Sequence, residues 1–276
     1  MGLVKPQRWW PGINRQHPLW RRTVGCWKFD DGGGNRLTDY SGRGNHGTLT
    51  NMDPVTDWVG TEQGWGLDFD TDDHVVMPSN MYQVADIAKS GITFAALVRV
   101  ETKGDNTGTA GLIGGAGTSG HSSFSAGGLR ILNGATWVQL TAVIYDGSYK
   151  TADSMEAASL QSGVWHLCVG RIEANGDLTA WLDGKLVAGP TATTPGSYAF
   201  EPAVFYLGRD PSSDYIENAQ LGFAGCWMRA LSAREIAELF ADLWVSVRPG
   251  RSTRYFVPAA PGGGTPYYYN WIRRAS

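Results

Sequence analysis

Four aspartates in one short stretch are the closest approach of this sequence to a pair of catalytic carboxylates. Asp68 and Asp70 share one face of a strand, because side chains in an extended chain alternate with a period of two. A retaining glycoside hydrolase needs two carboxyl groups about 5 Å apart. However, Asp72 and Asp73 lie in a turn-like segment and no glutamate is near. We therefore interpret the stretch as a solvated or cation-holding turn.

The other residues that could do chemistry are scattered. Neither a His-Glu-x-x-His zinc motif nor a Gly-x-Ser-x-Gly nucleophile motif occurs. The glycine-rich stretch 111–120 lacks the Lys-Ser/Thr pair of a phosphate-binding loop. The cysteines are odd in number and have no Cys-x-x-Cys spacing, which predicts buried thiols rather than zinc or disulfides: Cys26, Cys168 and Cys226. We therefore predict no cofactor and a protein that is not an enzyme.

The composition indicates which elements would position such residues. Of 276 residues, 42% are hydrophobic and 18% are charged, and the chain contains 37 glycines and 12 tryptophans. An average protein carries about 25% charged residues. A glycine-rich, aromatic chain of low charge favours short strands and tight turns over a helical bundle or disorder. No apolar run approaches the roughly 18 residues of a membrane helix, and the N-terminal sequence has no apolar signal region.

Apolar and alternating segments predict strands through most of the chain. They lie at residues 24–29, 64–69, 74–77, 92–100, 112–117, 128–132, 137–145, 163–173, 177–182, 185–187, 204–208 and 221–228. Asn175-Gly176 is the strongest hairpin turn. Ser232 and Glu235 form a capping box before a single predicted helix at 233–243. These elements predict an all-β fold: a two-sheet antiparallel jelly roll with one short C-terminal helix.

Charge divides the chain into three parts. Residues 1–23 and 246–276 each hold five basic residues and no acid, whereas residues 24–245 hold 13 basic residues and all 26 acids. The two terminal segments, which we call the arms, also hold nine bulky aromatic residues. We therefore expect an extended N-terminal arm at 1–23, one domain at 24–245 and an extended C-terminal arm at 246–276.

The composition of the arms predicts that they bind a partner. Disordered tails are poor in aromatic residues, whereas arginine, tryptophan and tyrosine are enriched at interface hot spots. We expect docking on neighbouring copies or on a larger acidic assembly, with wrapping around the acidic domain of the same chain as the alternative. Nucleic acid is disfavoured because an acidic domain repels phosphates. The predicted contact residues are Arg8, Trp9, Trp10, Trp20, Arg21, Arg22, Tyr267, Tyr268, Tyr269, Trp271, Arg273 and Arg274.

An ordered series of motifs resembles the laminin-G-like, concanavalin A-like jelly-roll superfamily over about residues 24–242. The motifs lie at 24–30, 39–49, 66–75, 165–166, 178–185 and 207–209, and at the closing run 229–236. The resemblance implies the two-sheet fold predicted above. The superfamily includes glycoside hydrolases, but their alternating acidic strand motif, of the type Glu-x-Asp-x-Glu, is absent here.

The same resemblance raises the question of calcium, which many relatives hold with Asp, Asn and carbonyl oxygens. Asp39 and Asn45 fall on matching positions, and Asp30 is a third candidate ligand. Gly222 stands where relatives often have an aspartate. We favour a turn stabilised by its own side chains over a structural calcium ion.

The layout of basic aromatic ends around one domain resembles proteins encoded by tailed bacteriophages and prophages. This resemblance implies a non-enzymatic virion protein, a capsid decoration or tail-associated protein, made in the host cytoplasm and anchored by its arms. Its expected partners are further copies of itself and phage capsid or tail proteins. The alternative is a lectin that binds host surface glycans, with Trp58, Trp65 and Trp137 as candidates. A glycoside hydrolase is a third alternative.

Overall fold

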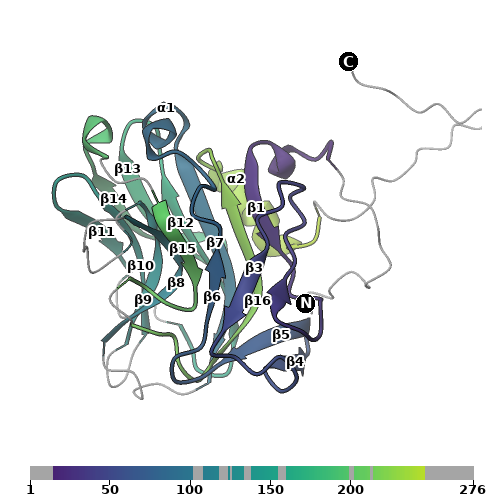
Figure 1. The fold of residues 1–276 in the computed structure, drawn as a ribbon. Coiled ribbons are helices and arrows are strands. Elements are labelled where there is room, and N and C mark those ends of the chain that lie inside the picture. The colour runs from purple at the N-terminus through teal and green to yellow at the C-terminus, as the bar shows by residue number, and fades with distance from the viewer. Residues whose placement is uncertain are drawn as a thin grey trace, which may run out of the picture.

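Strands dominate the computed structural model of this chain, which describes residues 15–101, 108–117, 124, 126–133, 138–154, 160–198, 202–211 and 214–245. They form two antiparallel sheets stacked face to face (Figure 1). Sheet A contains, in spatial order, β14 (Lys185–Ala192), β13 (Asp177–Leu182), β12 (Trp165–Ile172), β7 (Ile92–Val100), β16 (Ala219–Trp227), β5 (Gly64–Phe69) and β4 (Trp58–Thr61), and β1 (Thr23–Trp27) also pairs with β16. Sheet B contains β11 (Tyr149–Asp153), β10 (Val138–Tyr145), β9 (Gly128–Asn133), β8 (Gly108–Gly117), β15 (Pro202–Leu207), β6 (His74–Met77), β3 (Gly47–Thr50) and β2 (Arg36–Leu37).

The helices in the described ranges are short. They are η1 (Pro18–Trp20), η2 (Val84–Asp86), α1 (Ile87–Ser90), η4 (Pro195–Ser197) and α2 (Ala233–Ala241). The predicted capping box of α2 is present: the Glu235 amide donates to the Ser232 hydroxyl over 3.3 Å, and the Ser232 amide donates to the Glu235 carboxylate over 2.9 Å. None of these helices is long and apolar enough to cross a membrane.

Strand β7, in the middle of sheet A, is buried on both of its faces. Its alternate residues Phe94, Ala96 and Val98 belong to the inner core between the two sheets. The intervening Ala95 and Leu97 belong to a second cluster on the far face of sheet A. A strand covered on both sides reads as a continuous apolar run rather than an alternating one.

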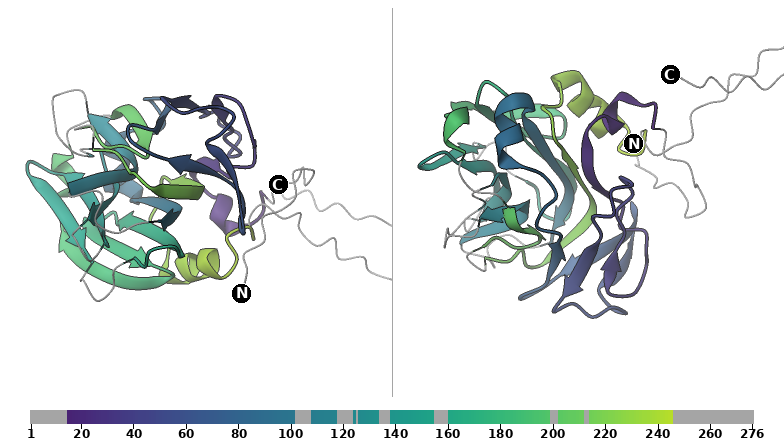
Figure 2. Two further views of the ribbon diagram at one scale, coloured as in Figure 1. Left: turned by 90° about the horizontal axis from the view of Figure 1, so that it is seen from below. Right: turned by 45° about the horizontal axis from the view of Figure 1, so that its top comes forward.

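The second cluster, which we call the outer core, is built from α2 and η1 against sheet A. Figure 2 shows α2 beside the N-terminal segment that contains η1. Sheet A contributes Phe223 and Trp227 of β16 and Leu167 and Val169 of β12 to the outer core. The segments that cover the sheet contribute Leu19, Leu231, Ile236, Leu239, Leu243 and Trp244. The helix therefore packs on the outer face of sheet A and does not contribute to the core between the sheets.

The predicted two-sheet fold, the single capped helix and the Asn175-Gly176 hairpin between β12 and β13 are confirmed. The three cysteines are buried free thiols, as predicted. Burial raises the pKa of Cys26 to about 12. The sequence pattern did not predict β2, β3, β4 or β11. These strands are short and lie at or near sheet edges, so they are specified by pairing with neighbours and not by a local apolar period.

Candidate functional site

A group of aromatic and charged side chains lies on the outer face of sheet B. In β15, Phe205 and Leu207 point into the inner core, so the intervening Tyr206 points outward. The same alternation turns His74 of β6 and Arg130 of β9 outward, because Val75 beside His74 and both Leu129 and Ile131 beside Arg130 belong to the inner core. We call this surface the sheet B face.

A loop after β15 adds two residues to the sheet B face. Gly208 has a left-handed backbone (φ 79°), and its carbonyl accepts a hydrogen bond from the Ile216 amide over 2.8 Å. The Asp214 carbonyl accepts from the amides of Asp210 (3.1 Å) and Gly111 (3.3 Å). These bonds fasten the loop to β8. They place Arg209 and Tyr215, which form an isolated β-bridge, beside Tyr206.

Arg209 lies between two tyrosine rings. Its guanidinium carbon is 5.0 Å from the Tyr206 ring centroid and 5.2 Å from the Tyr215 ring centroid. The His74 ring is 6.0 Å from Tyr206 and 5.6 Å from Tyr215. Arg209 and both tyrosines are partly exposed. The cluster thus offers ring faces next to a fixed fork of hydrogen-bond donors.

The sheet B face contains a neutral imidazole beside positively charged guanidinium groups. Burial lowers the pKa of His74, and the nearby Arg209 lowers it further, so the imidazole is neutral at pH 7. Its Nδ1–H then donates to the Asp72 carbonyl over 2.9 Å. Burial also lowers the pKa of Arg130, against the opposing effect of nearby carboxylates, first Asp153 and then Asp210. The sheet B face therefore carries two guanidinium groups set among carboxylates.

Little of this cluster could be predicted from the sequence. Arg209 belonged to a family motif, but Tyr206, Tyr215 and Arg130 were not candidates. The one local signal is the alternation Phe205-Tyr206-Leu207, which places a tyrosine on the face opposite the core. His74, Arg130 and Tyr215 come from three separate segments, which only the sheet register brings together.

The predicted acidic turn is confirmed as a turn. The Asp70 amide donates to the Asp73 carboxylate over 3.0 Å, and the Asp73 amide donates back to the Asp70 carbonyl over 2.9 Å. The Asp72 carboxylate accepts from the Asn51 side chain over 2.7 Å. Burial raises the pKa of Asp73 to about 6 and also raises that of Asp68. The cluster stabilises the β5–β6 connection.

The candidate calcium ligands are engaged by protein donors. One Asp39 carboxylate oxygen accepts from the amides of Cys26 (3.1 Å) and Ser41 (2.8 Å), and the other accepts from the Ser41 hydroxyl (2.7 Å) and the Asn45 amide (2.9 Å). Asp30 pairs with Lys28 over 2.8 Å. In the described part of the chain, no three acidic, histidine or cysteine side chains form a group that could hold a metal.

Only three of the predicted arm residues fall within the described ranges. Trp20 packs against the outer core, the Arg21 carbonyl accepts from Arg229 Nε over 3.0 Å, and Arg22 Nη1 donates to the Met228 carbonyl over 3.4 Å. This part of the arm therefore contacts its own domain. Nine predicted residues lie outside the described ranges: Arg8, Trp9, Trp10, Tyr267, Tyr268, Tyr269, Trp271, Arg273 and Arg274. Partner binding by the arms stays a prediction.

The three tryptophans considered for glycan binding differ in position. Trp58 is buried, and its indole N–H donates to the Gly34 carbonyl over 2.9 Å. Trp65 is 45% exposed, beside the glycine loop that contains Gly32. Trp137 lies outside the described residues. Trp65 therefore marks a second candidate surface for glycan binding, near the edge of sheet A.

The fold and motifs place the chain in a known superfamily. A family model described as the concanavalin A-like lectin/glucanases superfamily matches residues 69–237, which is more than half of the chain. The chain belongs to this superfamily. No curated protein matches the sequence.

Solved structures show the same fold at low identity. A Trypanosoma rangeli sialidase in complex with sialic acid is 19% identical, with a TM-score of 0.61, and the match covers 82% of this chain and 33% of the sialidase. The binding domain of botulinum neurotoxin DC in complex with SialylT is 13% identical, with a TM-score of 0.57, and the match covers 81% of this chain and 52% of that chain. This chain thus spans about a third of the sialidase and half of the toxin domain.

The prediction that this chain is not an enzyme is contradicted. Sialidases are among the structures that share its fold, and its superfamily includes glucanases. The prediction was based on a missing acidic strand motif. The absence of that motif excludes only one arrangement of two catalytic carboxylates. One fold can carry catalytic groups at different places.

Proposed function

We propose that this chain binds carbohydrate through the sheet B face. The observation that carries the proposal is the position of Arg209 between Tyr206 and Tyr215, with all three side chains partly exposed. A sugar ring has an apolar C–H face and a rim of hydroxyls. Tyrosine rings suit the face, and guanidinium and phenol groups suit the hydroxyls.

The comparisons support this class of ligand. The superfamily is named for lectins and glucanases, and two of the similar structures are complexes with sialic acid and with SialylT. The Arg209 guanidinium suits an acidic sugar, because arginine binds carboxylates through two parallel hydrogen bonds. Sialylated and neutral glycans are therefore the first ligands to compare.

The test is a glycan array followed by titration calorimetry on the best ligand. Replacing Arg209 with alanine, or both tyrosines with alanine, should weaken binding by about tenfold or more, because hot-spot contacts contribute at least about 1.4 kcal/mol each. Trp65→Ala is the matched control, since it removes an exposed aromatic residue from a different surface. Release of free sugar should be followed in the same samples, because the superfamily includes glucanases.

Two outcomes would contradict the proposal. One is a folded wild-type chain that binds no glycan on the array. The other is binding that survives Arg209→Ala but is lost in Trp65→Ala, which would move the site to the edge of sheet A.

The charge of the arms supports a second proposal, attachment to an acidic protein assembly. The arms carry ten basic residues and no acid, and the rest of the chain has twice as many acids as bases. We propose that the arms join the domain to copies of itself or to a phage capsid or tail, so that the carbohydrate-binding face is displayed on a virion. Complementary charge would raise the association rate and select the partner.

A further inference from the structure

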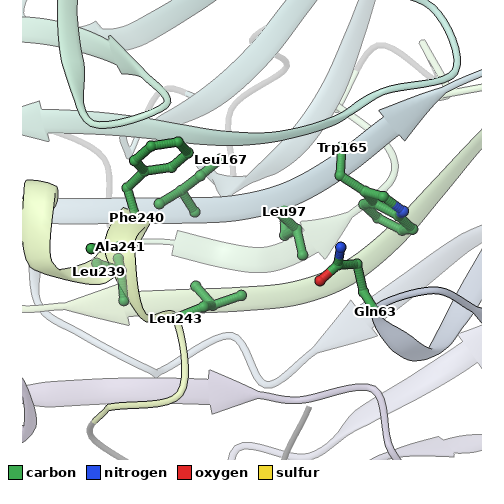
Figure 3. A pocket seen from close by; sticks show the side chains of 8 residues that line it. All are labelled: Gln63, Leu97, Trp165, Leu167, Leu239, Phe240, Ala241 and Leu243. Carbon is green, nitrogen blue, oxygen red and sulfur yellow. The ribbon is translucent and has the colours of Figure 1, made fainter. Parts of the chain in front are cut away.

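A cavity of about 450 Å³ lies between α2 and the outside of sheet A, away from the sheet B face. Leu97 of β7 and Leu167 of β12 form its base, and Leu239, Phe240 and Leu243 form the wall that comes from α2 and its end (Figure 3). The volume falls within the range of about 300–1,000 Å³ typical of small-molecule sites. We call it the α2 pocket.

One end of the α2 pocket holds polar groups. Gln63 projects from the turn between β4 and β5 and is 9% exposed. Its backbone is fixed because the Gln63 amide donates to the Thr61 hydroxyl over 3.1 Å, and that hydroxyl donates to the Gly64 carbonyl over 2.7 Å. The buried Gln63 Oε1 receives no hydrogen bond from any described residue. In Figure 3 this oxygen points toward Leu97 and Leu243, into the pocket.

Trp165 completes the same end. Its ring lies near Gln63, and its indole nitrogen lies on the edge of the ring that faces away from Leu97 (Figure 3). The ring lies over Gly222 of β16, where a Cβ would make an ordinary van der Waals contact with the ring at 3.4 Å. The ring therefore presents an apolar surface to the pocket. Both polar atoms of the Gln63 amide face the leucines in Figure 3, and Oε1 is the one that lacks a hydrogen bond from the described residues; the buried Trp165 indole N–H lacks an acceptor among them as well.

The lining selects the chemical class of the ligand. None of the residues that line the α2 pocket is charged, and transferring an unpaired charge into such a site is strongly unfavourable. A buried acceptor without a donor is also unfavourable, so a ligand that donates one hydrogen bond gains affinity there. We propose that the α2 pocket binds an uncharged amphiphile, with an apolar chain along the leucines and a hydroxyl or N–H group that donates to Gln63 Oε1.

The proposal is tested on the full chain with a neutral fluorescent probe, N-phenyl-1-naphthylamine, displaced by three competitors of equal chain length. Decanol should displace the probe at concentrations at least about tenfold lower than decanoate, because the carboxylate must lose its hydration. Decane should be weaker than decanol, because it has no hydroxyl to donate to Gln63.

Two variants separate the head group from the apolar chain. Gln63→Leu should weaken the binding of decanol about fivefold and leave the binding of decane unchanged, as expected for the loss of one hydrogen bond. Phe240→Asp places a charge at the pocket and should weaken every competitor; Phe240 is 40% exposed, so the variant keeps the core intact. Val55→Asp, at a position that is 79% exposed and does not line the pocket, is the matched control and should change nothing.

The proposal is overturned if the wild-type chain does not bind the probe, if decanoate competes as well as decanol, or if Gln63→Leu leaves decanol unchanged. A saturating amount of decanol should not alter glycan binding, since the two sites lie on opposite sheets. The failure of one proposal is therefore distinguishable from the failure of the other.

Discussion

Arg229 connects two segments that are far apart in the sequence. Its Nη1 and Nη2 donate to the two Glu235 carboxylate oxygens over 2.9 and 2.7 Å, in the two-pronged geometry that favours arginine. Its Nη2 and Nε also donate to the carbonyls of Pro18 and Arg21, both over 3.0 Å. One side chain thus joins the N-terminal segment to the first turn of α2.

This network makes the free energy of unfolding depend on pH in the acidic range. Hydrogen bonds from Arg229 lower the pKa of Glu235 to about 2, against a usual value of about 4.5. The carboxylate therefore contributes stability above about pH 4.5, and this contribution is lost as the pH falls toward 2. We expect Glu235→Gln to lower the free energy of unfolding by about 1 kcal/mol at pH 7, because solvent screens part of the interaction. The difference should shrink as the pH falls through about 2.

Urea unfolding at several pH values measures this effect. Glu62→Gln is the matched control, because Glu62 pairs with Arg99 at 3.3 Å in an exposed position and should show a smaller difference. A Glu235→Gln variant whose deficit stays constant from pH 7 to pH 2 would refute the linkage.

At the scale of elements, one glycine positions the loop of the candidate site. A Cβ placed on Gly111 of β8 would lie 2.3 Å from the Arg209 carbonyl carbon and 2.5 Å from the Asp210 nitrogen. Both are backbone atoms, so the loop would have to move away from β8. The close approach of loop and strand therefore depends on the missing side chain.

We expect Gly111→Ala to displace Arg209 and Tyr215 and to weaken glycan binding by about tenfold, at an unfolding cost of roughly 1–3 kcal/mol. Gly60→Ala in β4 is the control, since a Cβ there would meet no atom within 4 Å. Calorimetric titration and thermal unfolding of both variants give the two values. Unchanged glycan affinity in Gly111→Ala would mean that the loop does not form the site.

At the scale of the whole molecule, the N-terminal segment belongs partly to the domain. Leu19 is fully buried in the outer core, and its carbonyl accepts from the Trp227 indole over 2.6 Å. The Thr23 hydroxyl donates to the carbonyls of Leu19 and Trp20. Residues 17–23 therefore complete the outer face of sheet A, whatever the rest of the arm binds.

Two truncations separate this structural role from partner binding. Removing residues 1–22 should lower the melting temperature by roughly 5–10 °C, because a buried leucine and several hydrogen bonds are lost. Removing only residues 1–14 and 246–276 should leave the melting temperature within about 2 °C but abolish assembly, if the arms bind partners. Differential scanning calorimetry and light scattering measure these effects.

The attachment proposal fails if the full chain is a monomer at all concentrations and has no affinity for an acidic assembly. It also fails if the chain without residues 1–14 and 246–276 assembles normally. Equal melting temperatures for the two N-terminal truncations would contradict the structural role of Leu19.

The local sequence determined the class of fold. The apolar run of β7, the Asn175-Gly176 turn and the capping box at Ser232 were each sufficient to predict their elements, because each depends on contacts within a few residues. The composition was likewise enough to predict an all-β chain with buried thiols.

The tertiary structure alone decided where the sites lie. The apolar period of α2 shows that the helix has a buried face. It does not show which sheet, or which face of that sheet, the helix packs against. His74, Tyr206, Arg209 and Tyr215 come together, on the same face as Arg130, only because β6, β15, β8 and β9 pair in one register and the loop after β15 folds onto Gly111. Such pairings depend on the summed burial and hydrogen bonding of distant segments, and no short stretch of sequence contains that information.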